Sequence, residues 1–422
     1  MKLQATRFLA GCVGIAIAAV LSTAAAGTAA AQTKEVVIGA LYPMTGAGAQ
    51  IGLDAKTAIE VAVDIINGDV DLPLPLAKGE GLPHLGNAKV RVVFADHQGD
   101  PQKGRAEAER LLTQDKVTAL VGTYQSAVAA TVSQIAERYG VPFMSADNSS
   151  PSLNQRGLKW FFRTTAHDEM FTQAMFDFFK DMEAKTGQKV ETVALVHEDT
   201  LFGTDSSNMQ KKFAEEAKIK VAADIKYRAN SPSLTSEVQQ IKSADAQVVM
   251  PSSYTTDAIL LMKTMADLGY KPKAIVAQAA GFQEQAFFDA IKPAGEGVIS
   301  RSSFGVDVGA QRPAVQPVNE MFRKRANKDL NDNTAREIMA VLVLVDAIDR
   351  AGSTDPEKVR AALVATDIPG NQTIMPWKGV KFDQTGQNAE ATPVLQQYLD
   401  GQYRTVWPTE FASREVVWNI KK

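Results

Sequence analysis

The sequence contains a single cysteine, Cys12, so cysteine usage is compatible with either a reducing or an oxidising compartment. Aromatic residues make up only 7% of the 422 residues, and the formal net charge is −3. The chain therefore has neither the stacking platform nor the basic field that would hold a nucleic acid or an anionic membrane. The uncharged stretch 117–136 contains Thr, Gln and Ser and is broken by Gly122, so it is not a membrane span.

The remaining composition is that of an ordinary globular protein, 45% hydrophobic and 22% charged, and it is long enough for two domains. The N-terminus has the order of a secretory signal peptide: Lys2 and Arg7, an apolar run over 8–21, and small residues ending at Ala31. The sequence therefore predicts a signal peptide over 1–31, cleaved before Gln32, and a periplasmic location.

A second interpretation of the N-terminus is a lipoprotein signal, because Leu9-Ala10-Gly11-Cys12 resembles a lipobox. Too little apolar sequence precedes Cys12, and the apolar run 13–21 would then follow the lipid without a role. We therefore favour a soluble secreted protein over a protein lipidated at Cys12.

Strand and helix patterns alternate along the mature chain. Short β-branched runs, such as 36–41, 90–95 and 192–196, are followed by segments with helical apolar spacing, such as Ile59, Ala62, Val63 and Ile66. This alternation predicts βαβ units, and the pattern restarts after Arg163. We expect an α/β protein of two doubly wound parallel-sheet lobes. Segment 68–89, rich in Pro and Gly, interrupts the first lobe, and its composition favours an exposed loop insertion over a functional loop.

Motifs for cofactors and catalysis are weak. Gly46, Gly48 and Gly52 are spaced GxGxxxG, not as in a dinucleotide fingerprint, and a tight glycine turn explains them as well. The segment Asp96–Asp100 lacks the spacing of a calcium loop, and the four histidines lack zinc spacing. No GxSxG elbow is present. We expect no cofactor, no metal and no enzymatic activity.

Hydroxyl and amide side chains gather where two predicted strands end. Ser126 follows the strand 119–122, whereas Ser145, Asn148, Ser149 and Ser150 follow the strand 141–144. Ligands of open parallel sheets bind beyond the carboxyl ends of strands, and helix N-termini there suit a carboxylate. Each serine on its own could be a helix N-cap, but two adjacent clusters favour a polar ligand site.

The sequence resembles the branched-chain amino acid (Leu/Ile/Val) type of periplasmic binding protein of ABC transporters, over nearly the whole mature chain. The resemblance depends on an ordered set of segments: VVIGALYPMTG at 36–46, ADHQGDP at 95–101, VGTYQSAVA at 121–129, VPFMSADNSSPSL at 141–153, FFRTTAHD at 161–168, VALVHEDTLFG at 193–203 and GEGVIS at 295–300.

The resemblance implies the type I periplasmic binding protein fold, in which three hinge crossings join two lobes around a ligand cleft. We place the crossings near 163–166, 300–303 and 371–376. Lobe 1 would then comprise 32–164 and 302–373, and lobe 2 would comprise 165–301 and 374–410.

The resemblance also implies the ligand-binding residues, which are Gln125, Ser126, Asp147, Asn148, Ser149, Phe202, Tyr254, Ala280 and Gly281. Ser126 and Ser149 match positions that hold the ligand carboxylate, and Tyr254 matches an aromatic residue that closes over the ligand. Phe202 stands where relatives have a tyrosine.

Ala280 is the main departure, because relatives have a glutamate there that binds the ligand ammonium. Either Asp147 takes over this role, or the ligand lacks an α-amino group, as an aromatic acid or a short amide does; Asp147 could equally be a solvated loop residue.

The implied function is that of a monomeric solute-binding component, which captures a small carboxylate-bearing ligand and delivers it to the permease and ATPase subunits of an importer. A ligand-sensing module and an NAD-type enzyme on the same lobes are the alternatives from other classes.

Overall fold

The computed structural model describes residues 35–420. The predicted signal peptide over 1–31 and the Cys12 alternative lie outside these residues. No helix within 35–420 is both long enough and apolar enough to span a bilayer.

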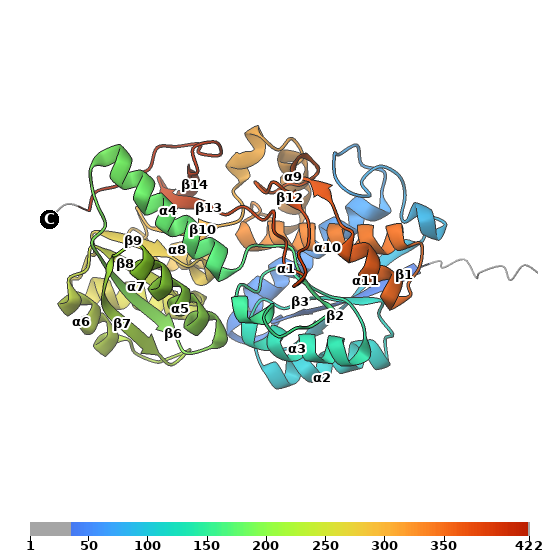
Figure 1. Cartoon of the computed structure of the whole chain (residues 1–422), viewed down its shortest axis with the longest axis horizontal. Helices are drawn as coiled ribbons and strands as arrows, with labels where there is room; N and C mark the ends of the chain where they lie inside the picture. Colours follow the sequence, from blue (N-terminus) through green and yellow to red (C-terminus); the bar gives the residue numbers. More distant parts are fainter. Residues whose placement is uncertain (1–34, 421–422) are drawn as a thin grey trace, which may run out of the picture. The chain divides into compact units, whose positions relative to one another are not determined.

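The first lobe is built on a parallel five-stranded sheet with the order β2-β1-β3-β4-β5. Its strands are β1 (Glu35–Tyr42), β2 (Lys89–Asp96), β3 (Ala119–Gly122), β4 (Phe143–Ser145) and β5 (Phe161–Arg163). Helices α2 (Pro101–Thr113) and α3 (Ser126–Tyr139) cover one face. The other face is covered by α1 (Ala49–Asn67), α9 (Val315–Ala326), α10 (Asp332–Ala351) and α11 (Pro356–Val364) (Figure 1).

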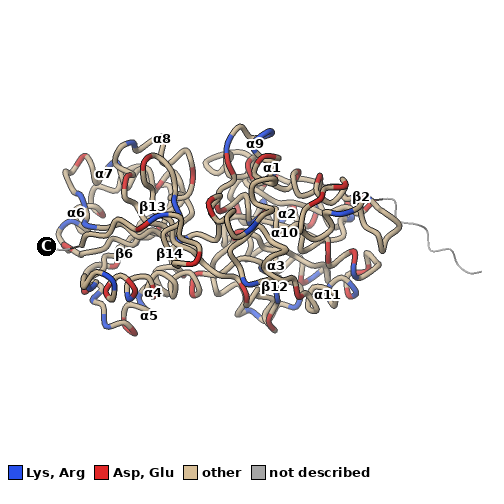
Figure 2. Tube along the Cα trace, turned by 90° about the horizontal axis from the view of Figure 1, so that it is seen from above, with Lys and Arg blue, Asp and Glu red and all other residues tan. Residues whose placement is uncertain are grey.

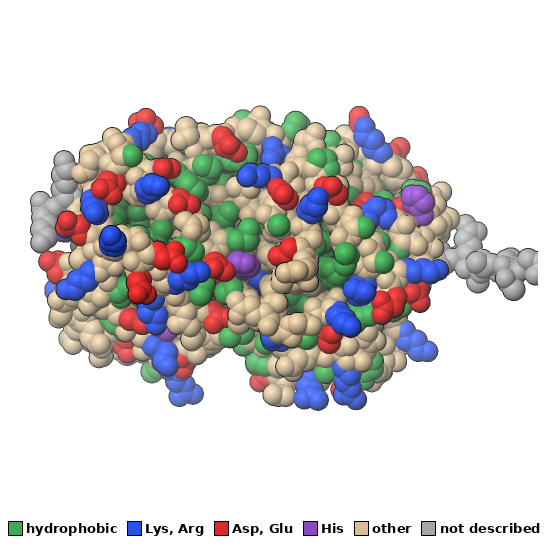
Figure 3. Space-filling view, viewed as in Figure 1, with side chains coloured by type: hydrophobic (Ala, Val, Ile, Leu, Met, Phe, Trp, Pro, Cys, Tyr) green, Lys and Arg blue, Asp and Glu red, His purple; other side chains and the backbone are tan. Residues whose placement is uncertain are grey.

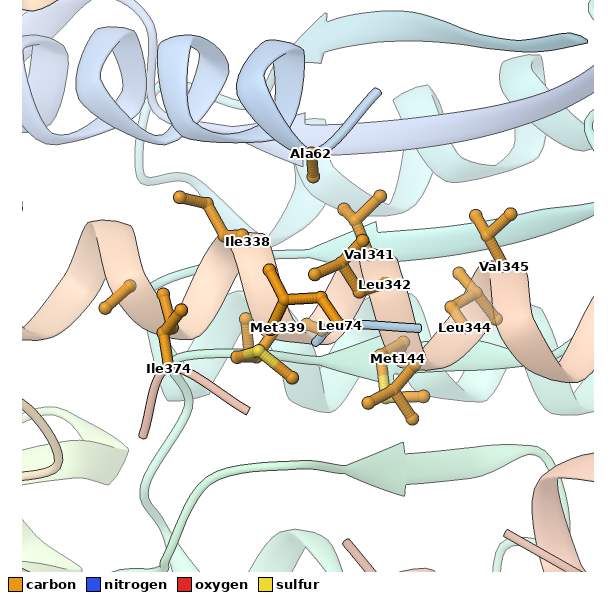
Figure 4. Close-up of a cluster of buried hydrophobic side chains, with 14 of the residues drawn as sticks. Ala62, Leu74, Met144, Ile338, Met339, Val341, Leu342, Leu344, Val345 and Ile374 are labelled. Atoms are coloured by element: carbon orange, nitrogen blue, oxygen red, sulfur yellow. The ribbon is translucent and has the colours of Figure 1, made fainter. Parts of the chain in front are cut away.

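Helix α10 forms the centre of the first lobe, because it is buried on nearly every side. The run 338–345 of this helix is apolar on every side, and such a run must be enclosed by other elements. Ile338, Leu342 and Val345 pack with Ala62 of α1 and Met144 of β4 (Figure 4). Helices α9, α10 and α11 therefore belong to the core of the N-terminal sheet, although they follow the parallel strands of the second lobe in the sequence.

The second lobe has a seven-stranded sheet with the order β14-β13-β10-β9-β8-β6-β7. Strands β6 (Thr192–Glu198), β7 (Lys220–Tyr227), β8 (Val248–Ser252), β9 (Ala274–Ala277) and β10 (Ile299–Ser302) are parallel. The antiparallel hairpin β13 (Val394–Leu399) and β14 (Gln402–Trp407) extends the sheet at one edge. Its helices are α4 (Asp168–Thr186), α5 (Leu201–Glu216), α6 (Thr235–Ala244), α7 (Thr255–Asp267) and α8 (Gln285–Ile291).

Alternating residues of the second sheet face two separate cores, as the pleat of a strand requires. In β6, Ala194 and Val196 pack with α6, α7 and α8, whereas Val193 and Leu195 pack with α4 and α5. Helices on both faces of a mainly parallel sheet are the doubly wound arrangement that the sequence predicts.

The third expected crossing, at 371–376, is wrong. Trp377 and Val380, assigned to the second lobe, lie in the core under α10. Strand β12 (Gly379–Val380) pairs with β11 (Ile368–Pro369), and Gln387 is paired with β5 through Arg163. The packing changes at Val394–Leu395, because Val394 contacts the first core and Leu395 the second. Segment 374–391 therefore belongs with the first lobe.

Segment 68–89 is not an exposed insertion. Leu72, Leu74 and Leu82 are buried in the core that contains α10. The backbone N–H of His84 donates to Asp349 Oδ1 of α10 at 2.9 Å. Burial of these leucines explains why the segment, despite its Pro and Gly content, is held against the lobe.

Charged side chains of both signs are interspersed over the molecule, with no large area of one sign on the visible face (Figures 2 and 3). This matches the small net charge of the sequence.

Candidate functional site

Ser126 is the first residue of α3 and lies where β3 ends. The backbone reaches it through Tyr124, whose φ of 79° is in the left-handed region. Gln125, not Ser126, is the N-cap, and no side-chain cap bond forms. The interpretation of Ser126 as an N-cap is therefore wrong. Its Oγ accepts from the Ser150 N–H at 3.4 Å, which joins the two polar loops.

The loop after β4 is fixed by buried hydrogen bonds. Asn148 Oδ1 accepts from Thr123 N–H at 3.1 Å and from Ser145 Oγ at 2.9 Å, so the Asn148 side chain is engaged in holding the loops together. Arg163 Nη1 donates to the carbonyls of Asn148 at 3.0 Å and Ser150 at 2.8 Å. Burial lowers the pKa of Arg163 to about 9. Ser149, also buried, is held by the Asp168 N–H, which donates to its carbonyl at 2.7 Å.

The aromatic residues from both lobes meet at this place. The Tyr254 ring lies 5.4 Å from that of Tyr124 and 5.2 Å from that of Phe202, both in tilted arrangements. Tyr254 precedes α7 and is half-buried, and the desolvation of its hydroxyl raises its pKa well above the usual value. The Ser126 backbone and Thr200 are hydrogen-bonding neighbours of the Tyr254 hydroxyl. The structure thus brings Ser126, Phe202 and Tyr254 together.

Ala280 and Gly281 lie in a tight turn, Ala280–Gln283, beside the start of α7. A β-carbon on Gly281 would lie 2.5 Å from the Thr255 N and Cα atoms, so only glycine fits against that backbone. Ala280 has a φ of 51° and is buried. The turn brings the backbone of Gly281 close to Tyr254. The methyl group of Ala280 carries no charge with which to bind a ligand ammonium.

Asp147 is not a solvated loop residue. Only 1% of its side chain is exposed, and its Oδ1 lies 3.2 Å from Arg336 Nε of α10. Arg336 Nη2 also contacts Asp332 Oδ2, at 2.8 Å, so two carboxylates share this guanidinium. Burial raises the pKa of Asp147, and the charge of Arg336 opposes that rise.

Sequence reasoning missed four charged groups near Asp147: Glu284, Arg301, Arg336 and Glu337. Glu284 follows Gly281 by three positions and is buried, which raises its pKa to about 8. Arg336 and Glu337 are consecutive charged residues, both buried, directly before the long apolar run of α10, and this was the available signal. Arg301 stacks on Phe171, with its guanidinium carbon 3.7 Å from the ring centroid.

Several buried polar atoms in this region have no hydrogen-bond partner within residues 35–420. They are Tyr124 Oη, Gln125 Oε1, Thr255 Oγ1, and Arg301 Nε and Nη1. Tyr124, Gln125 and Thr255 line a cavity of about 240 Å³, together with Tyr254. Buried polar groups are normally paired, so this concentration of unpaired atoms indicates a place for a polar ligand.

The glycine motif 46–52 has a structural explanation. A β-carbon on Gly52 would lie 2.4 Å from the Pro43 carbonyl oxygen, so Gly52 lets α1 pack against the end of β1. The segment 96–100 likewise forms a turn: Asp100 caps α2, accepting from Gln102 N–H at 2.7 Å and Lys103 N–H at 3.0 Å. Within 35–420, no group of three His, Cys, Asp or Glu residues is placed to hold a metal ion.

Two doubly wound lobes whose polar loops and aromatic rings meet define a bilobal protein with the type I periplasmic binding fold. The chain belongs to the periplasmic binding protein family, whose model matches residues 35–402. This confirms the resemblance and the fold class predicted from the sequence.

Similar proteins cover almost the whole chain. Leu/Ile/Val-binding protein homolog 7 of Brucella suis is 28% identical over 414 residues, which are 96% of this chain and 98% of that protein. Homolog 8 of Brucella abortus is 27% identical over 417 residues, 97% of this chain and 98% of that protein.

Two solved structures share the fold. The leucine-binding protein LivK of Thermotoga maritima has a TM-score of 0.75 at 20% identity, with 88% of this chain and 97% of that chain covered. The branched-chain amino acid transporter binding protein LivJ of Streptococcus pneumoniae, in complex with isoleucine, has a TM-score of 0.73 at 20% identity, with 89% and 100% covered.

Proposed function

We propose that this protein is the periplasmic solute-binding component of an ABC importer, without enzymatic activity. It captures a small carboxylate-bearing ligand of the amino-acid type between its lobes and delivers it to a membrane permease. The observation that carries this proposal is the set of unpaired buried polar atoms contributed by both lobes around Ser126, Tyr124 and Tyr254. Family membership and relatives named as Leu/Ile/Val-binding homologues support the transport role.

The carboxylate seat comprises the side chains of Ser126 and Ser149, beside the N-terminus of α3. The N-terminus of this 14-residue helix carries a partial positive charge, which favours an anion. The two serine side chains supply hydroxyl donors, because the Ser126 N–H already contacts the Tyr254 hydroxyl and the Val128 N–H donates to the Gln125 carbonyl at 3.1 Å. A carboxylate can thus be bound without a formal positive charge, since hydrogen bonds to charged groups are the stronger kind.

Lobe closure covers the ligand. Phe202 and Tyr254 of the second lobe meet Tyr124 of the first, and Ser152 Oγ donates across the lobes to Asp205 Oδ2 at 2.7 Å. These contacts exist only when the lobes are together. Scattering with and without ligand tests the closure: the radius of gyration falls on binding, and an unchanged radius contradicts it.

Calorimetric titration with a panel of amino acids and desamino acids tests the binding function. Ser126→Ala removes a hydrogen bond to a charged group, worth about 1.5–3 kcal/mol, so affinity for every carboxylate falls about 10- to 100-fold. Ser243→Ala, at an exposed position of α6, is the matched control and leaves affinity unchanged. A wild-type protein that binds no carboxylate, or a Ser126→Ala variant with full affinity, contradicts the proposal.

The periplasmic location depends on the signal peptide. N-terminal sequencing of the exported protein finds Gln32, or a residue within a few positions of it, at the mature end. If sequencing instead finds a lipid-modified Cys12 at that end, the prediction of a soluble periplasmic protein is wrong, and the protein is anchored to a membrane.

A further inference from the structure

The cavity lined by Tyr124, Gln125 and Thr255, called here the interlobe cavity, lies between the two lobes. Lobe 1 contributes the loop that leads into α3, and lobe 2 contributes the start of α7. Gln125 and Ala127, the sequence neighbours of Ser126, both line it, so the cavity is next to the proposed carboxylate seat. Its volume of about 240 Å³ is below the roughly 300–1,000 Å³ of sites for drug-sized molecules, so it suits a group of a few atoms.

The side chains around the interlobe cavity are polar but uncharged. Tyrosine, threonine, glutamine and asparagine side chains line it, together with glycines, alanines, Ile51 and Pro101. Among the residues that the structure describes, no acidic or basic side chain belongs to this lining. A charged group of a ligand would therefore lie in the cavity without a counter-ion, which is costly once the closed lobes exclude water.

Three oxygen atoms of the lining are buried and have no hydrogen-bond partner within 35–420: Tyr124 Oη, Gln125 Oε1 and Thr255 Oγ1. Only 6% of Tyr124 is exposed, so its hydroxyl is shielded from bulk water. The amide oxygen of Gln125 accepts a hydrogen bond, whereas the two hydroxyls can donate or accept one. A hydrocarbon in the cavity would leave all three oxygens unpaired, which disfavours its binding.

The position of the cavity next to the carboxylate seat disfavours a second anion. The seat holds its carboxylate with neutral hydroxyls and a helix N-terminus, so the closed cleft would already contain one negative charge without a counter-ion. A second carboxylate in the interlobe cavity would add a like charge close to the first. A carboxamide has nearly the same shape as a carboxylate but no charge, and it both donates and accepts hydrogen bonds.

We propose that the interlobe cavity selects ligands whose second polar group is uncharged and both donates and accepts hydrogen bonds, as a carboxamide does. This inference rests on the proposed function and specifies its ligand: a short acid that carries an amide is preferred to leucine, isoleucine or valine. The carboxylate binds at Ser126 and Ser149. The carboxamide occupies the cavity, where its N–H donates to Gln125 Oε1 and its oxygen accepts from the hydroxyls of Tyr124 and Thr255.

Two series of ligands of similar shape test the selection by calorimetry with the wild-type protein. Asparagine is compared with leucine and aspartate, and succinamate is compared with isocaproate and succinate, which are the same three compounds without the α-amino group. The second series separates selection by the cavity from the need for an ammonium partner. In the series that binds, the carboxamide is expected to bind at least 10-fold more tightly than both other members. Equal affinities, or a preference for the aliphatic acid or the dicarboxylate, overturn the inference.

Variants assign the preference to the cavity. Tyr124→Phe and Thr255→Val each remove one unpaired oxygen and change the shape little, and each lowers the affinity ratio of the carboxamide to the aliphatic acid about 2- to 10-fold, as expected for one hydrogen bond between neutral groups. Tyr270→Phe is the matched control, because the Tyr270 hydroxyl is likewise unpaired within 35–420 but does not line the cavity, so the ratio stays unchanged. A ratio that survives both cavity substitutions, or that Tyr270→Phe lowers equally, overturns the inference. Should one variant fail to unfold cooperatively in urea, the other variant and the wild-type ligand series decide the question.

The two proposals fail in different ways. If leucine or isocaproate binds more tightly than the carboxamides and Ser126→Ala weakens that binding, the solute-binding function stands and the selection by the cavity is wrong. The same conclusion follows if the protein binds another carboxylate but neither carboxamide. If the folded wild-type protein binds no member of either series and no other carboxylate, both proposals are wrong.

Discussion

We expect the stability of the protein in acid to depend on His97, which contacts the loop that carries Tyr124. Its ring is fully buried, with Nε2 3.0 Å from the Thr123 carbonyl, and Nδ1 accepts from the Gly99 N–H at 3.0 Å. One ring nitrogen donates and the other accepts, which defines a neutral imidazole. Protonation would place a hydrogen on Nδ1 against the Gly99 N–H, and burial lowers the pKa of His97 to about 4.

The sign of the pH effect follows from this lowered pKa. Below about pH 6.5 the unfolded chain takes up a proton at His97, whereas the folded protein does not until about pH 4, so the free energy of unfolding falls as the pH falls through this window. A His97 pKa of about 4 in place of 6.5 lowers the free energy of unfolding by about 3 kcal/mol once both states are protonated, and by about 2 kcal/mol at pH 5.

Urea unfolding at pH 7, 6, 5 and 4.5 measures the effect in wild type and in His97→Gln. Gln loses the neutral hydrogen bonds, so the variant is less stable at pH 7, but its stability falls less steeply with acid. The difference between the two proteins therefore narrows by about 2 kcal/mol from pH 7 to pH 5. Comparing the two proteins cancels the contributions of Glu198 and Glu284, whose raised pKa values act in the opposite direction.

Parallel pH profiles of wild type and His97→Gln would refute this reasoning, because they would mean that His97 titrates alike in both states. His84→Gln is the control. His84 is exposed and its pKa is raised by Asp349, so in this variant the free energy of unfolding must still fall with pH as steeply as in the wild type.

Three further predictions concern stability and closure. Gly52→Ala puts a β-carbon 2.4 Å from the Pro43 oxygen and lowers the free energy of unfolding by about 1–3 kcal/mol in urea titrations; an unchanged midpoint would contradict the contact. Leu342→Ala, in the fully buried centre of α10, costs about 2–5 kcal/mol by the same measurement, and a cost under 1 kcal/mol would be inconsistent with that burial. Asp205→Asn weakens the bond from Ser150 across the lobes and speeds ligand release in stopped-flow experiments, with unfolding unchanged; an unaltered release rate would remove Asp205 from the closing contacts.

The alternation of strands and helices could be predicted from the sequence because each element has its own apolar periodicity. The position of the third hinge crossing, expected at 371–376, could not. Segment 374–391 contains few periodic residues, and what assigns it to the first lobe is the burial of Trp377 and the pairing of Gln387 with Arg163, more than 200 residues away. Segment 68–89 was misjudged for a similar reason: its leucines are spaced irregularly, and only the surface of α10 makes them core residues.

The site was predicted in part. Ser126, Phe202 and Tyr254 lie together in the structure, and their roles in ligand binding stay predictions. The position of Asp147 in the sequence gave no sign of Arg336, because the two residues are 189 positions apart and come together only through the packing of α10 on β4. Glu284 was missed because the search for an acid on the second lobe was confined to the position before Gly281, whereas Glu284 directly follows the tight turn 280–283.

Charged residues within the core helix α10 have an energetic consequence. Burying Arg336 and Glu337 removes both from water, and their contacts with Asp147, Asp332 and Tyr42 offset only part of that cost, so this part of the fold is less stable than an apolar packing of the same volume would be. A ligand that binds only the folded state stabilises it, by about 2.7 kcal/mol at a hundredfold excess over Kd, so ligand binding offsets a cost of this kind.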